Sequence, residues 1–162
     1  MRIAVLGYSG AGKSTLAHRL GQQTSAPVLY LDTVQFTPGW QERDAAAGQH
    51  MVRDFMMQPN WIIEGNYHKF AFDQRITAAD RIYILTPSRW TCLVRIVRRY
   101  WQYRGRTRPY MAADCPERLT LPFLWFVLVT QRTRARRQEY LDLARQYPDK
   151  VTLVRRGRQI QL

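Results

Sequence analysis

Residues 7–14 constrain this chain more than any other stretch. They read Gly-Tyr-Ser-Gly-Ala-Gly-Lys-Ser and fit the pattern G-x-x-x-x-G-K-[ST] at every defined position. An apolar run at residues 2–6 precedes them, and a helix-forming run begins at Lys13. A strand, a glycine-rich turn and a helix in this order predict a phosphate-binding loop. The alternative is a strand–helix turn that binds nothing, but such a turn does not need Lys followed by Ser.

The residue types of this loop predict how it binds a nucleotide. Glycines at its bends let backbone N–H groups face one concavity, and the positive end of the following helix attracts anions. We expect Lys13 to contact the β- and γ-phosphates of ATP during catalysis, and the Ser14 hydroxyl to ligate Mg²⁺. The loop residues expected to bind the nucleotide are Gly7, Ser9, Gly10, Ala11, Gly12, Lys13, Ser14 and Thr15.

Length and composition favour one folded domain over residues 1–162. Hydrophobic residues make up 46% of the chain, which is enough for a single core. The longest apolar run, at 123–129, is far shorter than the roughly 20 residues that span a bilayer, and no signal-peptide pattern appears. Cys92 and Cys115 lack metal-binding spacing, so we expect free thiols, a cytoplasmic protein and no membrane partner.

The net charge of +13 is concentrated in one segment. The chain contains 22 Arg and 3 Lys, and residues 89–137 contain 12 of the arginines with only two acids, Asp114 and Glu117. The guanidinium group recognises phosphate in bidentate fashion, so this basic segment predicts phosphorylated partners. A solvated basic face is the alternative for about half of these arginines.

Short apolar strands alternate with helices along the chain. Strands are predicted at 2–6, 27–31, 61–63, 81–85 and 151–154, and helices at 13–24, 42–57, 68–78, 90–103 and 120–147. This alternation predicts an α/β fold, a three-layer sandwich whose parallel sheet has helices on both faces. In such sheets the ligand lies beyond the carboxyl ends of the strands.

Two carboxylates are expected at those strand ends. Asp32 closes the second strand, where it can act as a general base toward an acceptor hydroxyl; a helix cap or turn aspartate is the alternative. Glu64 closes the third strand, where it can hold Mg²⁺ together with Ser14; a salt-bridged loop glutamate is the alternative.

Arginines are expected to supply positive charge around a transferred phosphoryl group. Arg95, Arg98 and Arg99 have helical spacing, and we expect Arg98 to contact the nucleotide. Arg104 and Arg108 follow in a loop that can close over the site, and we expect both to be catalytic. Two further groups are expected on the acceptor side, Arg75 for an acceptor phosphate and the rings of Trp40, Tyr67 and Phe70, for which a core position is the alternative.

Three blocks of the sequence together resemble the bacterial topology modulation protein family. They are Gly7 to Ala17, then Leu31-Asp32 with Phe36 to Trp40, then Trp61 to Tyr67, and the later stretches Tyr103 to Pro109, Cys115 to Glu117 and Tyr147 to Val151 fit the same family. The resemblance covers essentially the whole chain.

That family is similar to the adenylate-kinase-like branch of P-loop kinases. The resemblance implies a five-stranded parallel sheet of order 2-3-1-4-5, with ATP and Mg²⁺ as cofactors. It also implies an acceptor-binding region at about 33–58 and an Arg-rich lid at about 104–117. The Glu64-Gly65 pair stands where nucleotide kinases carry Asp-Gly.

Two functions are consistent with these features. The favoured one is a kinase that transfers the γ-phosphate of ATP to a small, nucleotide-like acceptor. The alternative is an ATP-dependent regulator that contacts nucleic acid and modulates DNA topology through residues 89–137, where Trp and Tyr alternate with Arg.

Overall fold

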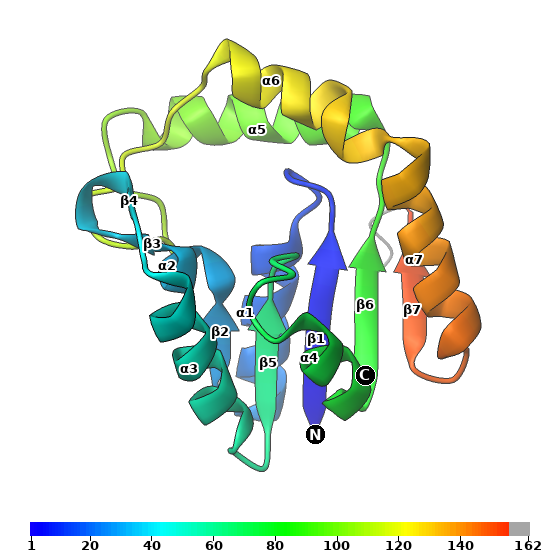
Figure 1. The fold of residues 1–162 in the computed structure, drawn as a ribbon. Coiled ribbons are helices and arrows are strands. Elements are labelled where there is room, and N and C mark those ends of the chain that lie inside the picture. The colour runs from blue at the N-terminus through cyan, green and yellow to red at the C-terminus, as the bar shows by residue number, and fades with distance from the viewer. Residues whose placement is uncertain (156–162) are drawn as a thin grey trace.

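The computed structural model describes residues 1–155, which form an open five-stranded parallel sheet with helices on both faces (Figure 1). The strand order is β2-β5-β1-β6-β7, which becomes 2-3-1-4-5 when these five strands are numbered along the chain. The predicted fold class and strand order are therefore confirmed. The strands are β1 (Arg2–Gly7), β2 (Val28–Tyr30), β5 (Trp61–Glu64), β6 (Arg81–Leu85) and β7 (Val151–Val154).

The helices surround this sheet, and α5 and α6 lie across the carboxyl ends of its strands (Figure 1). A small antiparallel hairpin, β3 (Phe36–Thr37) and β4 (Gln41–Glu42), stands apart from the main sheet. No helix within residues 1–155 is long and apolar enough to cross a membrane. The helices are α1 (Lys13–Thr24), α2 (Leu31–Gln35), α3 (Ala45–Met56), α4 (Phe72–Ala78), α5 (Arg89–Tyr103), α6 (Leu121–Leu128) and α7 (Arg134–Gln146), with 3-10 turns η1 (Pro38–Trp40) and η2 (Thr130–Arg132).

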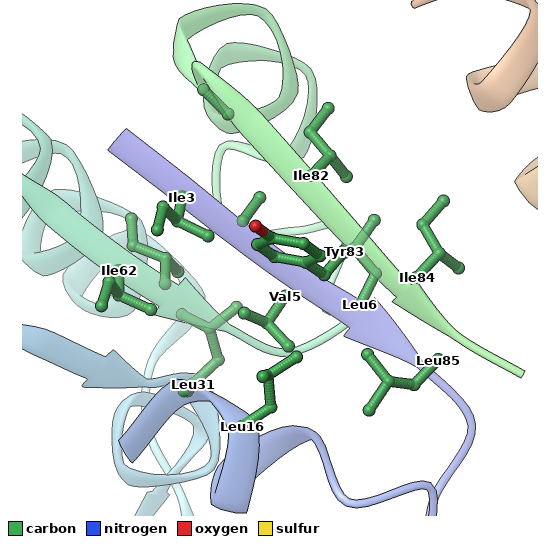
Figure 2. Packing of buried hydrophobic residues seen from close by; sticks show 14 of the residues in the cluster. Ile3, Val5, Leu6, Leu16, Leu31, Ile62, Ile82, Tyr83, Ile84 and Leu85 are labelled. Atoms are coloured by element: carbon green, nitrogen blue, oxygen red, sulfur yellow. The ribbon is translucent and has the colours of Figure 1, made fainter. Parts of the chain in front are cut away.

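The core lies on both faces of the central strand β1. Residues 3–6 of β1 are fully buried, because α1 lies behind the sheet and α4 in front of it (Figure 1). Leu16 of α1 and Leu31 of α2 pack close to Val5 (Figure 2). Each fully buried aliphatic side chain stabilises the fold by about 1.5–3 kcal/mol, so this layer holds the loop after β1 in place.

The second strand ends earlier than the sequence predicts. Leu31 to Gln35 form α2, so Asp32 lies in the first turn of a helix and not at the end of a strand. The hydroxyl of Thr33 donates to the carbonyl of Tyr30 at 2.7 Å and occupies the acceptor at the strand end. A short side-chain hydrogen bond of this kind competes with strand pairing, which explains the early stop.

The single long helix predicted for residues 120–147 is wrong, because the chain breaks at residues 129–133. α6 ends at Leu128, η2 follows, and α7 begins after Thr133, whose hydroxyl accepts from the N–H of Arg136 at 3.3 Å. This threonine is an N-cap, with extended backbone angles that cannot continue a helix. The break turns the chain from the top of the sheet down along β7 (Figure 1).

The prediction that Arg75 binds an acceptor phosphate is also wrong, because Arg75 is fully buried in α4. Its guanidinium donates to the carbonyls of Phe70 at 2.9 Å, Gly65 at 3.2 Å and Tyr67 at 2.9 Å. Burial lowers the pKa of Arg75 to about 10, which still leaves it charged at neutral pH. Arg75 therefore fixes the loop at 65–70, and Phe70 belongs to the core.

Replacing Arg75 tests this structural role. Arg75→Met leaves three carbonyls without their donor, and we expect it to lower the free energy of unfolding by about 3 kcal/mol in urea denaturation. Arg53→Met, at an exposed position of α3, is the matched control and should change it by less than about 0.5 kcal/mol. Equal effects of the two substitutions would contradict the assignment.

Candidate functional site

One cleft of about 1350 Å³ opens at the carboxyl ends of the strands. Its walls come from the phosphate loop, the end of β5, the inner side of α5 and the 104–117 loop that leaves α5. These segments are far apart in the sequence, and the parallel sheet brings them together as the position of the strand ends predicts.

The backbone of the phosphate loop requires glycine where it approaches its neighbours. Gly7 has a φ of 132° and Gly10 a φ of 76°. A Cβ at Gly7 would collide with the backbone of Leu85, and one at Gly10 would lie 2.7 Å from the carbonyl oxygen of Cys92. The loop is therefore pressed against β6 and α5, and side chains at these positions would displace it.

Three polar side chains hold the phosphate loop from outside. The Asn66 side chain accepts from the N–H of Gly7 at 3.0 Å and donates to its carbonyl at 2.7 Å. The buried Gln131 side chain accepts from the N–H of Ser9 at 2.7 Å, and Arg95 donates to the carbonyl of Ala11 at 2.8 Å. These bonds come from the segment after β5, from η2 and from α5, so three separate parts of the fold hold the phosphate loop in place.

The end of the loop leads into a helix that can attract an anion. Gly12 is the N-cap of α1, and no side chain of the described residues caps this end. The first N–H groups of a helix have no partner within it, and they carry a partial positive charge. This helix end therefore suits phosphate oxygens.

Lys13, Ser14 and Glu64 form a compact polar group at the helix start. The Ser14 hydroxyl donates to Glu64 Oε2 at 2.9 Å, and Lys13 Nζ lies 3.7 Å from Glu64 Oε1 and 3.2 Å from the carbonyl of Tyr8. Burial raises the pKa of Glu64 above its ordinary value, while Lys13 and the Ser14 hydrogen bond act in the opposite direction. A buried carboxylate with an unstable charge is typical of functional sites.

This donor set fits Mg²⁺ when the nucleotide supplies further ligands. Magnesium is commonly bound by one or two carboxylates, with waters and phosphate oxygens completing its coordination. Glu64 and Ser14 offer one carboxylate and one hydroxyl side by side. No group of three or more His, Cys, Asp or Glu side chains suited to a metal occurs among residues 1–155, so the protein alone does not form a closed cage.

Asp32 lies in the same cleft, held by two donors. The Tyr67 hydroxyl donates to Asp32 Oδ1 at 2.8 Å, and Arg108 Nη2 donates to Asp32 Oδ2 at 2.7 Å. Burial, and then the charge of Asp32, raise the pKa of Tyr67, so the phenol stays protonated and remains a donor. The Asp32 side chain is 32% exposed, which leaves it accessible to a ligand.

Glu117 joins the 104–117 loop to α5. Its side chain is only 5% exposed, and its Oε1 lies 2.6 Å from Arg99 Nη2 while Oε2 lies 3.5 Å from Arg108 Nε. Burial, and then the nearby charge of Arg108, lower the pKa of Arg99. Asp32, Arg108, Glu117 and Arg99 therefore form one continuous charge network across the cleft.

The β3–β4 hairpin closes the other side of the same loop. Trp40 Nε1 donates to the carbonyl of Pro116 at 3.1 Å, its N–H points at Cys115 Sγ at 3.3 Å, and the N–H of Gly39 donates to the carbonyl of Asp114 at 3.1 Å. The 104–117 loop is thus tied both to the hairpin and to α5, in an arrangement that covers the cleft.

Two of the arginines expected in the site lie outside the cleft. Arg98 is exposed on α5, and Arg104 is exposed with its guanidinium 5.7 Å from the centre of the Trp101 ring. α5 buries Cys92 and Ile96, and residue 98 falls on the other side of the helix from them. Arg95 and Arg99 line the cleft in place of Arg98, and Arg108 lines it where Arg104 does not.

Most of the other predicted residues do line the cleft. Lys13, Asp32 and Glu64 do so with the phosphate-loop residues from Ser9 to Thr15, while Gly7 lies behind them at the start of the loop. Trp40 and Tyr67 line it as well. Both cysteines are free, as expected, and both are buried.

Sequence reasoning missed three residues that position the site: Asn66, Glu117 and Gln131. Asn66 directly follows the Glu64-Gly65 pair, so a polar residue at a strand end was an available signal. Glu117 is one of two acids among 12 arginines, and an isolated acid in a basic segment indicates an ion pair. Gln131 carried no such signal, because its role depends on the break between α6 and α7.

Comparison with known proteins shows the fold alone. No protein-family model matches this chain, and no curated protein matches it. A solved structure from Chloroflexus aurantiacus j-10-fl, provisionally designated a kinase, is similar with a TM-score of 0.53 at 15% identity, over 98% of this chain and 90% of that one. A gluconokinase from Sinorhizobium meliloti 1021 is similar with a TM-score of 0.51 at 15% identity, over 97% and 83%.

Another match is an uncharacterized protein from Eubacterium ventriosum ATCC 27560, of whose length this chain spans 63%. Its TM-score is 0.45 at 16% identity, over 62% of this chain. The likenesses at the higher TM-scores show that the chain shares the fold of these two structures. Substrates and cofactors are not established by similarity at this level of identity.

The raised pKa of Glu64 predicts a pH-dependent stability difference. The folded state holds the Glu64 proton more tightly than the unfolded state, so wild-type stability falls as pH rises from the ordinary glutamate pKa to the raised value. Glu64→Gln removes this loss. In urea titrations, we expect the free energy of unfolding of Glu64→Gln, relative to that of wild type, to increase as pH rises across that window. At more acidic pH this difference should be constant. A difference that shrinks with rising pH would contradict the sign.

Removing the Glu117 charge should loosen the 104–117 loop. Glu117→Gln weakens two ion pairs, and we expect trypsin to cleave after the exposed Arg104 and Arg106 about tenfold faster than in wild type, because cleavage follows the open population. Asp114→Asn, an exposed neighbour whose side chain makes no ion pair in the described structure, is the matched control. Equal cleavage rates in the two variants would show that Glu117 does not hold the loop.

Proposed function

We propose that this protein is an ATP- and Mg²⁺-dependent phosphotransferase acting on a small acceptor. The observation that carries the proposal is one cleft lined by both halves of a transfer site. Lys13, Ser14 and Glu64 line it as one group, and the ion pair of Asp32 with Arg108 lines the same cleft. The kinase-like architecture of the chain is consistent with this function.

On the donor side, the chain would hold the triphosphate through its phosphate loop. The N–H groups at the start of α1 and the Lys13 ammonium suit phosphate oxygens, and Glu64 with Ser14 would hold Mg²⁺. Bound Mg²⁺ supplies charge neutralisation at the bridging phosphate oxygens. Burial disfavours the charge of Glu64 and raises its pKa, and a bound metal ion would compensate that charge.

On the acceptor side, Asp32 is the residue we assign to the acceptor hydroxyl. Its carboxylate is partly exposed and fixed by Tyr67 and Arg108, so it can accept a proton from a hydroxyl placed before it. Arg108 and Arg99 place positive charge where a transferred phosphoryl group would develop negative charge. In this proposal the 104–117 loop is the lid that carries one of these charges and excludes water.

The size of the cleft favours two small ligands over one large ligand. A pocket for one drug-sized molecule measures about 300–1000 Å³, whereas this cleft holds about 1350 Å³. That volume suits a nucleotide and a small acceptor together. Trp40, which lies in the predicted acceptor region at 33–58, and Tyr67 offer surfaces for a ring.

Two substitutions separate binding from transfer. Lys13→Ala should weaken ATP binding at least about tenfold in calorimetry, because a charged hydrogen bond contributes about 1.5–3 kcal/mol. Asp32→Asn should leave ATP binding within about threefold and lower transfer about 10²–10⁴-fold, as expected for loss of a general base. Transfer is measured as phosphorylated product from ATP, Mg²⁺ and a library of small hydroxyl and phosphate compounds.

Matched controls are Lys150→Ala, far from the phosphate loop in sequence, and Asp54→Asn on the exposed side of α3. Neither should change binding or transfer. Unchanged ATP affinity in Lys13→Ala would contradict the donor site. ATP binding without transfer to any compound would contradict the kinase assignment and leave the nucleotide-binding regulator of the topology modulation resemblance as the better hypothesis.

A further inference from the structure

An apolar surface lies on the outside of α5 and α6, away from the cleft. On α5 it consists of Trp90, Val94 and Trp101, which are 65–66% exposed, and on α6 of Leu121, Trp125 and Val129, which are 81%, 64% and 42% exposed. We call these six residues the α5/α6 face. Isolated apolar side chains are normal on protein surfaces, but six large exposed ones on two adjacent helices indicate an interaction site.

The helical spacing places these residues in one stripe on each helix. Trp90, Val94 and Trp101 are four and seven residues apart, so they share the side of α5 opposite to the buried Cys92 and Ile96. Leu121, Trp125 and Val129 are each four residues apart along α6 and its end. The two helices lie next to each other across the top of the sheet, so the two stripes belong to adjacent helices (Figure 1).

The charge around this face selects an anionic partner. Arg89, Arg98, Arg104 and Arg106 are exposed on α5 and just beyond it, whereas no acid occurs in residues 81–113 or 118–138. Two copies of the chain meeting through this face would bring the same arginines together and repel each other. An anionic surface would instead be attracted to every one of these arginines.

The side-chain types favour a lipid surface over nucleic acid. Val94, Leu121 and Val129 have no aromatic face on which a base could stack, and phosphate groups would leave them without an apolar partner. A bilayer interface offers acyl chains for these residues, a headgroup layer for the indole rings, and anionic headgroups for the arginines. A membrane interface with anionic headgroups therefore suits all three features of the face together.

We infer that the α5/α6 face docks on a membrane surface that contains anionic lipids, with both helices lying in the interface. The expectation of no membrane partner rested on the absence of a spanning run, which does not bear on surface attachment. The 104–117 loop connects α5 to α6, so docking places that loop beside the membrane. This inference does not depend on the proposed phosphotransfer.

Vesicle binding by the full chain tests the inference. We expect co-sedimentation with phosphatidylcholine vesicles that contain about 30 mol% phosphatidylglycerol, and at least about tenfold weaker binding to pure phosphatidylcholine. Val94→Ser combined with Leu121→Ser should weaken binding to the anionic vesicles about tenfold or more, because both side chains lose their apolar burial. Met57→Ser, which alters an apolar residue directly after α3 that is 83% exposed, should stay within about twofold.

A second pair of variants tests the charges. Arg98→Gln should weaken binding to anionic vesicles and make the remaining binding less sensitive to salt, whereas Arg53→Gln on α3 should do neither. All altered positions are exposed, and thermal melting checks that each variant is folded.

Three results would overturn the inference. One is equal binding to neutral and anionic vesicles, or none to either. Another is a dimer in lipid-free solution that the Val94 and Leu121 substitutions abolish, since the face would then join two copies. The third is salt-dependent binding of single-stranded oligonucleotides that requires Trp90 or Trp101 and is unaffected by the Val94 and Leu121 substitutions.

Discussion

The buried carboxylate of Glu64 is the group on which the rest of this site depends. It lies at the end of β5, where the Ser14 hydroxyl and the Lys13 ammonium meet it, and so ties the phosphate loop to the sheet. Burial disfavours the charged form of this carboxylate and so raises the pKa of Glu64. An apolar side chain would suit the fold better at this position, so a charge retained here is best explained by the chemistry of the cleft.

A second charge network lines the same cleft. Asp32, Arg108, Glu117 and Arg99 link α2 and α5 to the 104–117 loop, and the hairpin holds that loop from its other side. Because Arg108 contacts Asp32 directly, an acceptor approaching Asp32 must share or displace this ion pair. Loop position and acceptor binding are therefore coupled through one guanidinium group, if the loop acts as the lid we propose.

The sequence predicted the elements with strong local signals and missed those that depend on tertiary contacts. The strand–loop–helix unit at Arg2–Thr24 follows from the motif, and the order of the sheet is what the family resemblance implies; both are confirmed. The break at 129–133 was missed because it lacks Gly and Pro and depends on Thr133 as an N-cap and on Gln131 reaching Ser9. Arg75 and Arg98 were misplaced because charge and spacing alone do not state which side of a helix faces the cleft. Arg75 lies in the core beside three carbonyls, and Arg98 faces away from the cleft.

The helix α5 shows how one basic segment can contain two kinds of arginine. Arg95 and Arg99 flank its buried side and reach the phosphate loop and Glu117, whereas Arg98 belongs to the outer side with Val94 and Trp101. A helix that served only the cleft would carry polar residues on its outer side, since exposed Trp and Val gain nothing from water. The apolar outer side therefore requires its own explanation, separate from phosphate binding. Because the same helix holds the loop over the cleft through Arg99, any partner that binds the outer side contacts the element that positions the site.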